Sequence, residues 1–235
     1  MKNIAVVFGG FSSEYEVSVK SGKFIYENLK DNRSLNVYQI CISKESNYVI
    51  YDNNKYDLNY MDFSFSINGK IINLDGIFNI IHGEPGENGE LADILEKNNI
   101  PQTGCNSFVS NLTFDKKRYK DFVNELDIPS SKHILLTNEN QHNLTKIISD
   151  ISIPCIVKPN NGGSSIGVSK VNNIDDLEDK IKIAFKESNQ VLIEDFLDGQ
   201  EVSVGVLETN GERIILPVTE IISENELFDY SAKYL

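Results

Sequence analysis

The sequence predicts a parallel α/β domain at the amino terminus, followed by domains of the α+β class. In the first hundred residues, apolar runs end in glycine turns and are followed by segments of helical periodicity, which is the βα pattern of an open parallel sheet. Farther along, short apolar runs are joined by polar turns, as in antiparallel hairpins. We expect three domains, over residues 1–104, 105–193 and 194–235, the last of them incomplete.

The first βα unit starts with residues 4–8, an unbroken apolar run that closes at Gly9 and Gly10. A run without polar alternation is typical of a central strand covered on both faces. Helical periodicity follows, with Glu14 near its start. A carboxylate there complements the positive end of the helix dipole, and the residues alone indicate no further role for Glu14.

A second loop follows the apolar residues 71–81 and runs from His82 to Gly89. Glycines, a proline and acidic residues at the carboxyl end of a strand are typical of the edge where open α/β sheets bind ligands. His82 is either a base or substrate contact, or a hydrogen-bonded structural residue. The loop is a candidate site on its position alone.

Residues 111–126 predict one helix, which carries the only dense basic cluster, residues 116–118. In a chain with 35 acidic and 22 basic side chains, that cluster is either a solvated helix face or a place where a lysine reaches a polyphosphate. Composition leaves both open.

A glycine- and serine-rich turn after Lys158 is the strongest local signal. Apolar runs on both sides predict two antiparallel strands joined by this loop. Gly162 and Gly163 can take positive φ, and the Ser164 and Ser165 hydroxyls add donors for an oxyanion. The spacing fits neither a dinucleotide fingerprint nor a Walker loop, and it resembles in its physics a glycine-rich hairpin over nucleotide phosphates. An ordinary hairpin with a solvated lysine is the alternative.

Net charge, cysteine spacing and the length of the apolar runs argue against nucleic-acid-binding, disulfide-rich and membrane-spanning proteins. A net charge of −13 argues against a nucleic-acid partner, because such binding needs clustered Lys and Arg. Three widely spaced cysteines, two of them in apolar runs, favour reduced core thiols in a cytoplasm. No run approaches the roughly 20 apolar residues that a bilayer requires. We expect a cytoplasmic protein that does not enter membranes.

Six groups of residues stand in a characteristic order along the whole chain: residues 9–18, 82–89, 115–116, 157–167, 193–201 and 230–234. This order resembles the ATP-grasp superfamily, and specifically the D-alanine-D-alanine ligases. The resemblance implies that the second and third domains are ATP-grasp domains. It implies that the carboxylate of one D-alanine attacks the γ-phosphate of ATP to give an acylphosphate, which the amine of a second D-alanine converts to the dipeptide used in peptidoglycan. It also implies a homodimer.

The resemblance implies a role for each matched residue. Glu14, Ser164 and Tyr234 would form a catalytic hydrogen-bonded triad, and Glu14 and His82 would bind the first D-alanine. The residues that would hold ATP phosphates are Lys116, Lys158, Gly162, Gly163, Ser164, Ser165 and Lys233. Adenine would contact Glu194 and the backbone at Asp195 and Leu197, and ribose would contact Glu201. Tyr234 also favours an amine as the second substrate, since relatives that use D-lactate lack it.

One departure from the family concerns its Mg²⁺ or Mn²⁺ ligands, which come from Arg-x-Asp and Glu-x-Asn strands. None of the three arginines, Arg33, Arg118 and Arg213, begins Arg-x-Asp. We therefore assign no metal ligand, expect these ligands beyond residue 235, and expect this chain by itself to be inactive. The alternatives are a ligase for another amino acid or for D-lactate, a non-catalytic nucleotide-binding module, and an α/β domain whose glycine loops are only turns.

Overall fold

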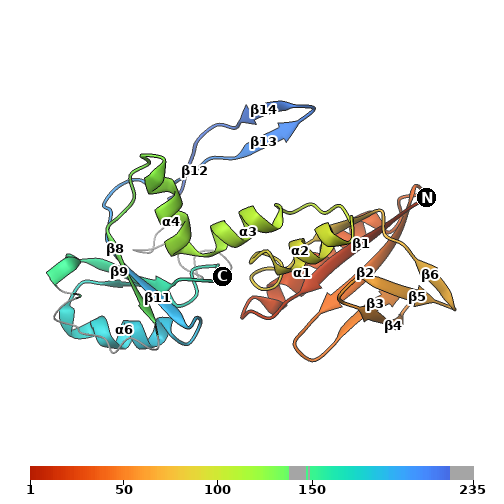
Figure 1. Ribbon diagram of the computed structural model, residues 1–235, viewed down its shortest axis with the longest axis horizontal. Coiled ribbons are helices and arrows are strands. Elements are labelled where there is room, and N and C mark those ends of the chain that lie inside the picture. The colour runs from red at the N-terminus through yellow and green to blue at the C-terminus, as the bar shows by residue number, and fades with distance from the viewer. Residues whose placement is uncertain (138–146, 148, 223–235) are drawn as a thin grey trace. The chain divides into compact units, whose positions relative to one another are not determined.

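The computed structural model describes residues 1–137, 147 and 149–222, which divide into two compact units. Unit 1 comprises Met1–Ser130 together with Asn160–Gly163. Unit 2 comprises Ser131–Pro159 and the chain from Ser164 onward. Figure 1 shows the helices and strands of each unit. The short segment Asn160–Gly163 thus belongs by its contacts to unit 1, although the strand before it belongs to unit 2.

Unit 1 is built on a seven-stranded sheet in the order β6-β5-β4-β3-β2-β1-β7. Its strands are β1 (Lys2–Gly9), β2 (Leu35–Ile42), β3 (Asn47–Tyr51), β4 (Asn54–Asn59), β5 (Ser64–Ile67), β6 (Lys70–Ile72) and β7 (Gly76–Asn79). The α/β class is confirmed, but only β2, β1 and β7 are parallel neighbours, and the strands from β3 to β6 extend the sheet in antiparallel fashion. Asp52-Asn53 and Asn68-Gly69 have the positive φ angles that two-residue hairpin turns require.

Helices cover both faces of the parallel strands in unit 1. Val6 and Phe8 of β1 pack with α1 (Tyr15–Leu29), whereas Ala5 and Val7 pack with α2 (Glu90–Lys97). Successive strand residues point to opposite faces, so a strand buried on both sides must be apolar throughout. This explains the unbroken apolar run at the start of the chain.

The helix predicted over residues 111–126 is in fact two helices. α3 (Ser107–Phe114) ends before Asp115, whose backbone is extended with φ −89° and ψ 103°, and α4 (Lys116–Glu125) begins after it. The prediction of one helix was wrong because Asp115 caps α4: its carboxylate accepts a hydrogen bond from the Arg118 N–H at 3.0 Å. The break places Lys116 at the first position of a new helix.

Unit 2 contains a four-stranded antiparallel sheet in the order β10-β9-β11-β8. Its strands are β8 (His133–Thr137), β9 (Cys155–Pro159), β10 (Ser169–Val171) and β11 (Gln190–Asp195). The 3₁₀ turn Ile174–Asp176 leads into α6 (Leu177–Ala184), whose apolar side chains form a core with one face of the sheet. The predicted hairpin of β9 and β10 around the glycine-rich loop is confirmed.

Two short ladders complete unit 2: β12 (Val202–Ser203) pairs with β15 (Thr219–Glu220), and β13 (Val206–Thr209) pairs with β14 (Glu212–Ile215). The β13–β14 ladder is one of the antiparallel hairpins expected for the later part of the chain, and all its strand residues are exposed. Within the described ranges, no helix is both long enough and apolar enough to span a bilayer.

Candidate functional site

The backbone of the glycine-rich loop adopts left-handed conformations at several residues. Gly162 has a φ of 113°, as glycine permits, but Gly163 does not have a positive φ, whereas Ser164 and Ser165 do, at 48° and 57°. Left-handed serines are energetically unfavourable and are retained where the surroundings fix them, often at functional sites.

Lys116 contacts this loop within unit 1. Its ammonium donates to the carbonyl oxygen of Gly162 at 2.8 Å and to that of Asn160 at 3.3 Å. The other cations of the basic cluster have partners near α4: Lys117 pairs with Asp121 at 2.5 Å, and Arg118 donates to Asn111. The cluster is therefore divided, and its first lysine is the one turned toward the glycine-rich loop.

Glu14 lies beside the same loop. It is 4% exposed, and a Cβ built on Gly163 would lie 3.2 Å from its Oε2 atom. Gly83, in the loop after β7, is also close, since a Cβ built there would lie 3.6 Å from Glu14 Oε2. A carboxylate, two glycine backbones and the Lys116 ammonium thus gather around one short segment of unit 1.

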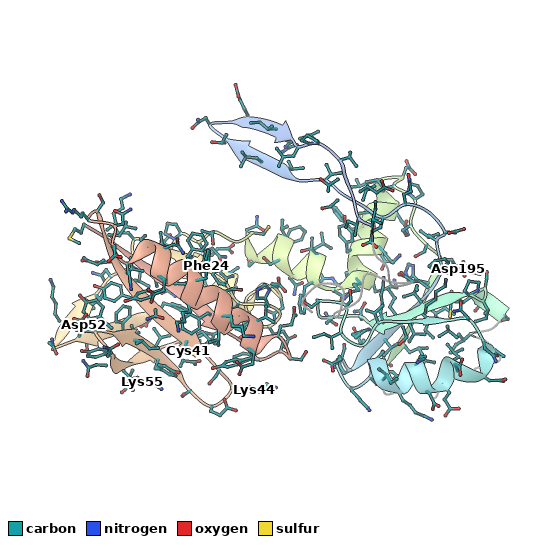
Figure 2. All side chains as sticks on the ribbon, turned by 180° about the vertical axis from the view of Figure 1, so that it is seen from behind. Phe24, Cys41, Lys44, Asp52, Lys55 and Asp195 are labelled. Carbon is teal, nitrogen blue, oxygen red and sulfur yellow. The ribbon has the colours of Figure 1, made fainter. Side chains whose placement is uncertain are left out.

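His82 precedes Gly83 and is half-buried. Its carbonyl oxygen accepts a hydrogen bond from the Ser12 hydroxyl at 2.8 Å, which ties this loop to the turn before α1. The residue also lines a shallow hollow with Lys20 and Phe24; Phe24 lies on the exposed side of α1 in Figure 2. The backbone of His82 lies close to Glu14, because the next residue, Gly83, is in contact with the Glu14 carboxylate.

Glu87 is a site residue that sequence reasoning missed. Neighbouring protein atoms partly desolvate its carboxyl and raise its pKa, although the residue as a whole keeps contact with solvent, and the Gly83 N–H donates to Oε2 at 2.7 Å. With Lys116, Gly162, Cys105 and other residues of unit 1, it lines a cavity of about 430 Å³. The sequence shows that Glu87 is one of the acids of the loop from His82 to Gly89, but it does not show that Glu87 and Lys116 line the same cavity.

A second group of charges lies on the sheet of unit 2. Lys158 stands opposite Leu192, and Glu194 lies two residues farther along β11, so all three side chains share one face. Lys158 and Glu194 form an ion pair with side chains only 19% and 11% exposed. The Ser131 hydroxyl donates to the other carboxylate oxygen of Glu194 at 3.1 Å. The opposite face of the sheet packs on α6.

The remaining predicted residues differ in exposure. Asp195, labelled at the end of β11 in Figure 2, is half-buried, and its carboxylate accepts from the Ser152 N–H at 2.8 Å. Leu197 and Glu201 are exposed. Lys233 and Tyr234 lie outside the described residues. The structure thus brings Glu14, Lys116 and the first half of the loop together in unit 1, and joins Lys158 to Glu194 in unit 2.

We found no candidate metal site in the part of the chain that the structure describes. There, no group of three or more His, Cys, Asp or Glu side chains is arranged to hold an ion. Because the residues present do not fit a divalent cation, we assign no chemical step to one.

The fold and these side chains define a protein of two compact units, an α/β unit and an α+β unit, with a glycine-rich loop that follows Lys158 and contacts Lys116. Family models described as the D-ala D-ala ligase N-terminus and the D-ala D-ala ligase C-terminus match residues 3–105 and 122–235. The D-alanine-D-alanine ligases of Flavobacterium johnsoniae and Flavobacterium psychrophilum are 42% and 43% identical to it over nearly the whole chain, which spans 72% and 71% of their lengths. The chain therefore belongs to the D-alanine-D-alanine ligase family.

Solved structures agree with this assignment. D-alanyl-alanine synthetase A from Vibrio cholerae has a TM-score of 0.84 at 29% identity, with 99% of this chain and 71% of that chain covered. The VanG D-Ala:D-Ser ligase from Enterococcus faecalis has a TM-score of 0.81 at 31% identity, with coverage of 100% and 74%. Both the fold class and the family expected from the sequence are confirmed.

Proposed function

We propose that this chain provides ATP-binding and D-alanine-binding parts of an ATP-dependent D-alanine-D-alanine ligase that serves peptidoglycan synthesis. The observation that best supports this is the convergence in unit 1: the Lys116 ammonium at the carbonyl of Gly162, and the buried Glu14 carboxylate beside Gly163. A cation for phosphate and an anion for an amino acid's ammonium flank one loop segment.

In this proposal the carboxylate of one D-alanine attacks the γ-phosphate and displaces ADP, and the resulting acylphosphate is attacked by the amine of a second D-alanine, which expels phosphate. Glu14 and His82 hold the first D-alanine, with Glu14 bound to its ammonium. Lys116, Lys158 and the loop donors offset the negative charge of the phosphates, which is the main task in phosphoryl transfer. Ser164 and Tyr234 complete the catalytic triad with Glu14, and Lys233 reaches the phosphates.

The nucleoside part of ATP contacts unit 2. Glu194 accepts a hydrogen bond from the adenine amino group, the backbone at Asp195 and Leu197 contacts the ring, and Glu201 binds the ribose hydroxyls. The ion pair between Lys158 and Glu194 must loosen for this, because Lys158 is shared between the carboxylate and the phosphates. The pair keeps both side chains on the polar face of the sheet until ATP arrives.

Calorimetric titration of the chain with ATP tests the nucleotide part. Lys116→Met should weaken ATP binding roughly ten- to hundredfold, the effect of losing a hydrogen bond to a charged group. Lys117→Met is the matched control, because Lys117 is the next residue and its ammonium pairs with Asp121 instead. Equal effects of the two substitutions would reject the role given to Lys116.

Equilibrium dialysis of radiolabelled D-alanine, with ATP present, tests the amino-acid part. Glu14→Gln removes the negative charge and should abolish measurable D-alanine binding. Glu16→Gln, an exposed acid in the first turn of α1, should leave it unchanged. If Glu14→Gln binds D-alanine as well as the original chain, Glu14 does not hold the ammonium.

We also propose that this chain alone binds ATP without turnover, because its described residues provide no metal-ligand group. Phosphate release above background with ATP, Mg²⁺ and D-alanine would contradict this.

Since one similar structure is a D-Ala:D-Ser ligase, D-serine and D-lactate are the competitors to compare with D-alanine in the dialysis. A homodimer is part of the same proposal, and light scattering on the chain tests it.

A further inference from the structure

Asn160 is a fully buried polar residue that has no role in the proposed chemistry. It is 0% exposed and directly follows β9, at the start of the glycine-rich loop. Buried amides are retained where hydrogen bonds satisfy them, so the partners of such a residue show what it holds in place. Asn161 Oδ1, on the adjacent residue, accepts from Nδ2 at 3.3 Å, and three further partners lie 43 to 45 positions back in the sequence, around the first turn of α4.

Both ends of the Asn160 amide contact the junction of α3 and α4. Oδ1 accepts from the Lys117 N–H at 2.9 Å, and Nδ2 donates to Asp115 Oδ1 at 2.9 Å. The backbone carbonyl of Asn160 accepts from the Lys116 N–H at 3.1 Å and from the Lys116 ammonium at 3.3 Å. Asp115 in turn caps α4 through the Arg118 N–H. Asn160 therefore contacts the residue before Lys116, the residue after it, and Lys116 itself.

We propose that Asn160 is a positioning residue that fixes the backbone of Lys116 against the loop. The Lys116 ammonium can then move from the Gly162 carbonyl to an ATP phosphate while the backbone of Lys116 stays in place. This inference rests on the proposed function, in which Lys116 binds ATP. The side-chain amide is suited to the task because Oδ1 accepts from the Lys117 N–H and Nδ2 donates to Asp115, so it holds the residues on both sides of Lys116 without bonding to the ammonium itself.

The chemistry of the amide is specific, since one end must accept and the other must donate. Asn160→Asp preserves the shape and keeps an acceptor for the Lys117 N–H, but it places a carboxylate oxygen against Asp115 Oδ1. Two like charges at hydrogen-bond distance repel, and the donor is lost. The double variant Asn160→Asp with Asp115→Asn exchanges the two groups and restores one donor and one acceptor. In the original chain Asp115 Oδ1 accepts from both Asn160 Nδ2 and the Arg118 N–H, so the amide introduced at position 115 must turn its nitrogen toward residue 160 and its oxygen toward Arg118, and we expect partial recovery.

The first experiment needs no nucleotide. Hydrogen exchange followed by NMR should show that the Lys116 and Lys117 amides exchange roughly tenfold faster or more in Asn160→Asp, because loss of the bond to Asp115 and repulsion between the two carboxylates loosen position 160 from the first turn of α4. The double variant Asn160→Asp with Asp115→Asn should return both amide exchange rates toward those of the original chain. Unchanged rates in Asn160→Asp would overturn the proposal whether or not the chain binds ATP.

The second experiment titrates ATP. Asn160→Asp should weaken binding roughly tenfold, with partial recovery in the same double variant. In a Lys116→Met background, the same substitution should have little further effect, because the group that Asn160 positions is gone. Asn106→Ala is the control, since it removes the cap of α3, where Asn106 Oδ1 accepts from the Val109 N–H at 2.8 Å. It should lower thermal stability and leave ATP affinity unchanged.

These outcomes separate the two proposals. If the original chain does not bind ATP, the proposed function fails, while the exchange data still report on the positioning contact. If ATP binds but Asn160→Asp binds it equally well or more tightly, or weakens it equally in the Lys116→Met background, Asn160 has only a structural role and the inference is rejected.

Discussion

The ion pair of Lys158 and Glu194 allows a stability prediction whose size follows from burial. Lys158→Met keeps the apolar stem of the side chain and removes the ammonium, which leaves the Glu194 carboxylate in a site where its side chain is only 11% exposed. Removing one partner of a buried pair typically costs about 3–5 kcal/mol, because the other charge is left uncompensated.

The cost should be smaller here, because 19% of the Lys158 side chain and 11% of that of Glu194 remain exposed, so solvent screens part of the charge. We therefore expect about 2–3 kcal/mol of destabilisation in unit 2, or roughly a 30- to 150-fold increase in the rate of amide exchange through unfolding. The double variant Lys158→Met with Glu194→Gln should recover at least half of the loss, because it leaves no buried charge.

Hydrogen exchange by mass spectrometry suits this test, since the chain has no tryptophan and the method reads each unit separately. Peptides from β9 and β11 report on unit 2, and a peptide from β1 serves as the internal reference. Lys182→Met is the matched control: its pair with Glu178, at 3.1 Å, has side chains more than 60% exposed, and such surface pairs contribute under about 1 kcal/mol. Equal exchange in Lys158→Met and Lys182→Met would refute the reasoning.

Two further outcomes follow from packing and burial. Gly22→Ala should lower the unfolding free energy of unit 1 by about 1–3 kcal/mol, because its Cβ would lie 2.6 Å from Phe8, whereas Gly199→Ala, with open space around it, should be nearly neutral in chemical denaturation. Iodoacetamide at pH 8 should label exposed Cys105 and spare buried Cys155, whose pKa burial raises to about 11. Since the unfolded thiol ionises first, stability should fall as the pH rises from about 9 toward 11, and early labelling of Cys155 would contradict its burial.

Local signals were sufficient for much of the fold. The apolar run of residues 4–8 predicted a strand covered on both faces, and α1 and α2 do cover β1 on its two sides. The glycine-rich turn after Lys158 predicted a hairpin, which β9 and β10 form. These predictions succeeded because strand burial and turn formation depend on residues within a few positions of one another.

Other features depend on groups far apart in the sequence. The break at Asp115 was not predicted, because residues 111–126 have acceptable helical periodicity and the extended backbone is held by Asn160, 45 positions away. Ser131 was missed for the same reason, since its partner Glu194 lies 63 positions farther along the chain. Nothing next to either residue indicates its partner.

The sequence by itself determined the class of the protein and the types of group available for its chemistry: a glycine-rich loop, lysines that can meet phosphate, and an acid at the first helix. Only the tertiary structure decided how these groups are used, turning Lys116 rather than Lys117 toward the loop and pairing Lys158 with Glu194. The physical reason is that composition and periodicity act locally, whereas the partner of a buried charge or amide is chosen by which distant segments the fold brings together.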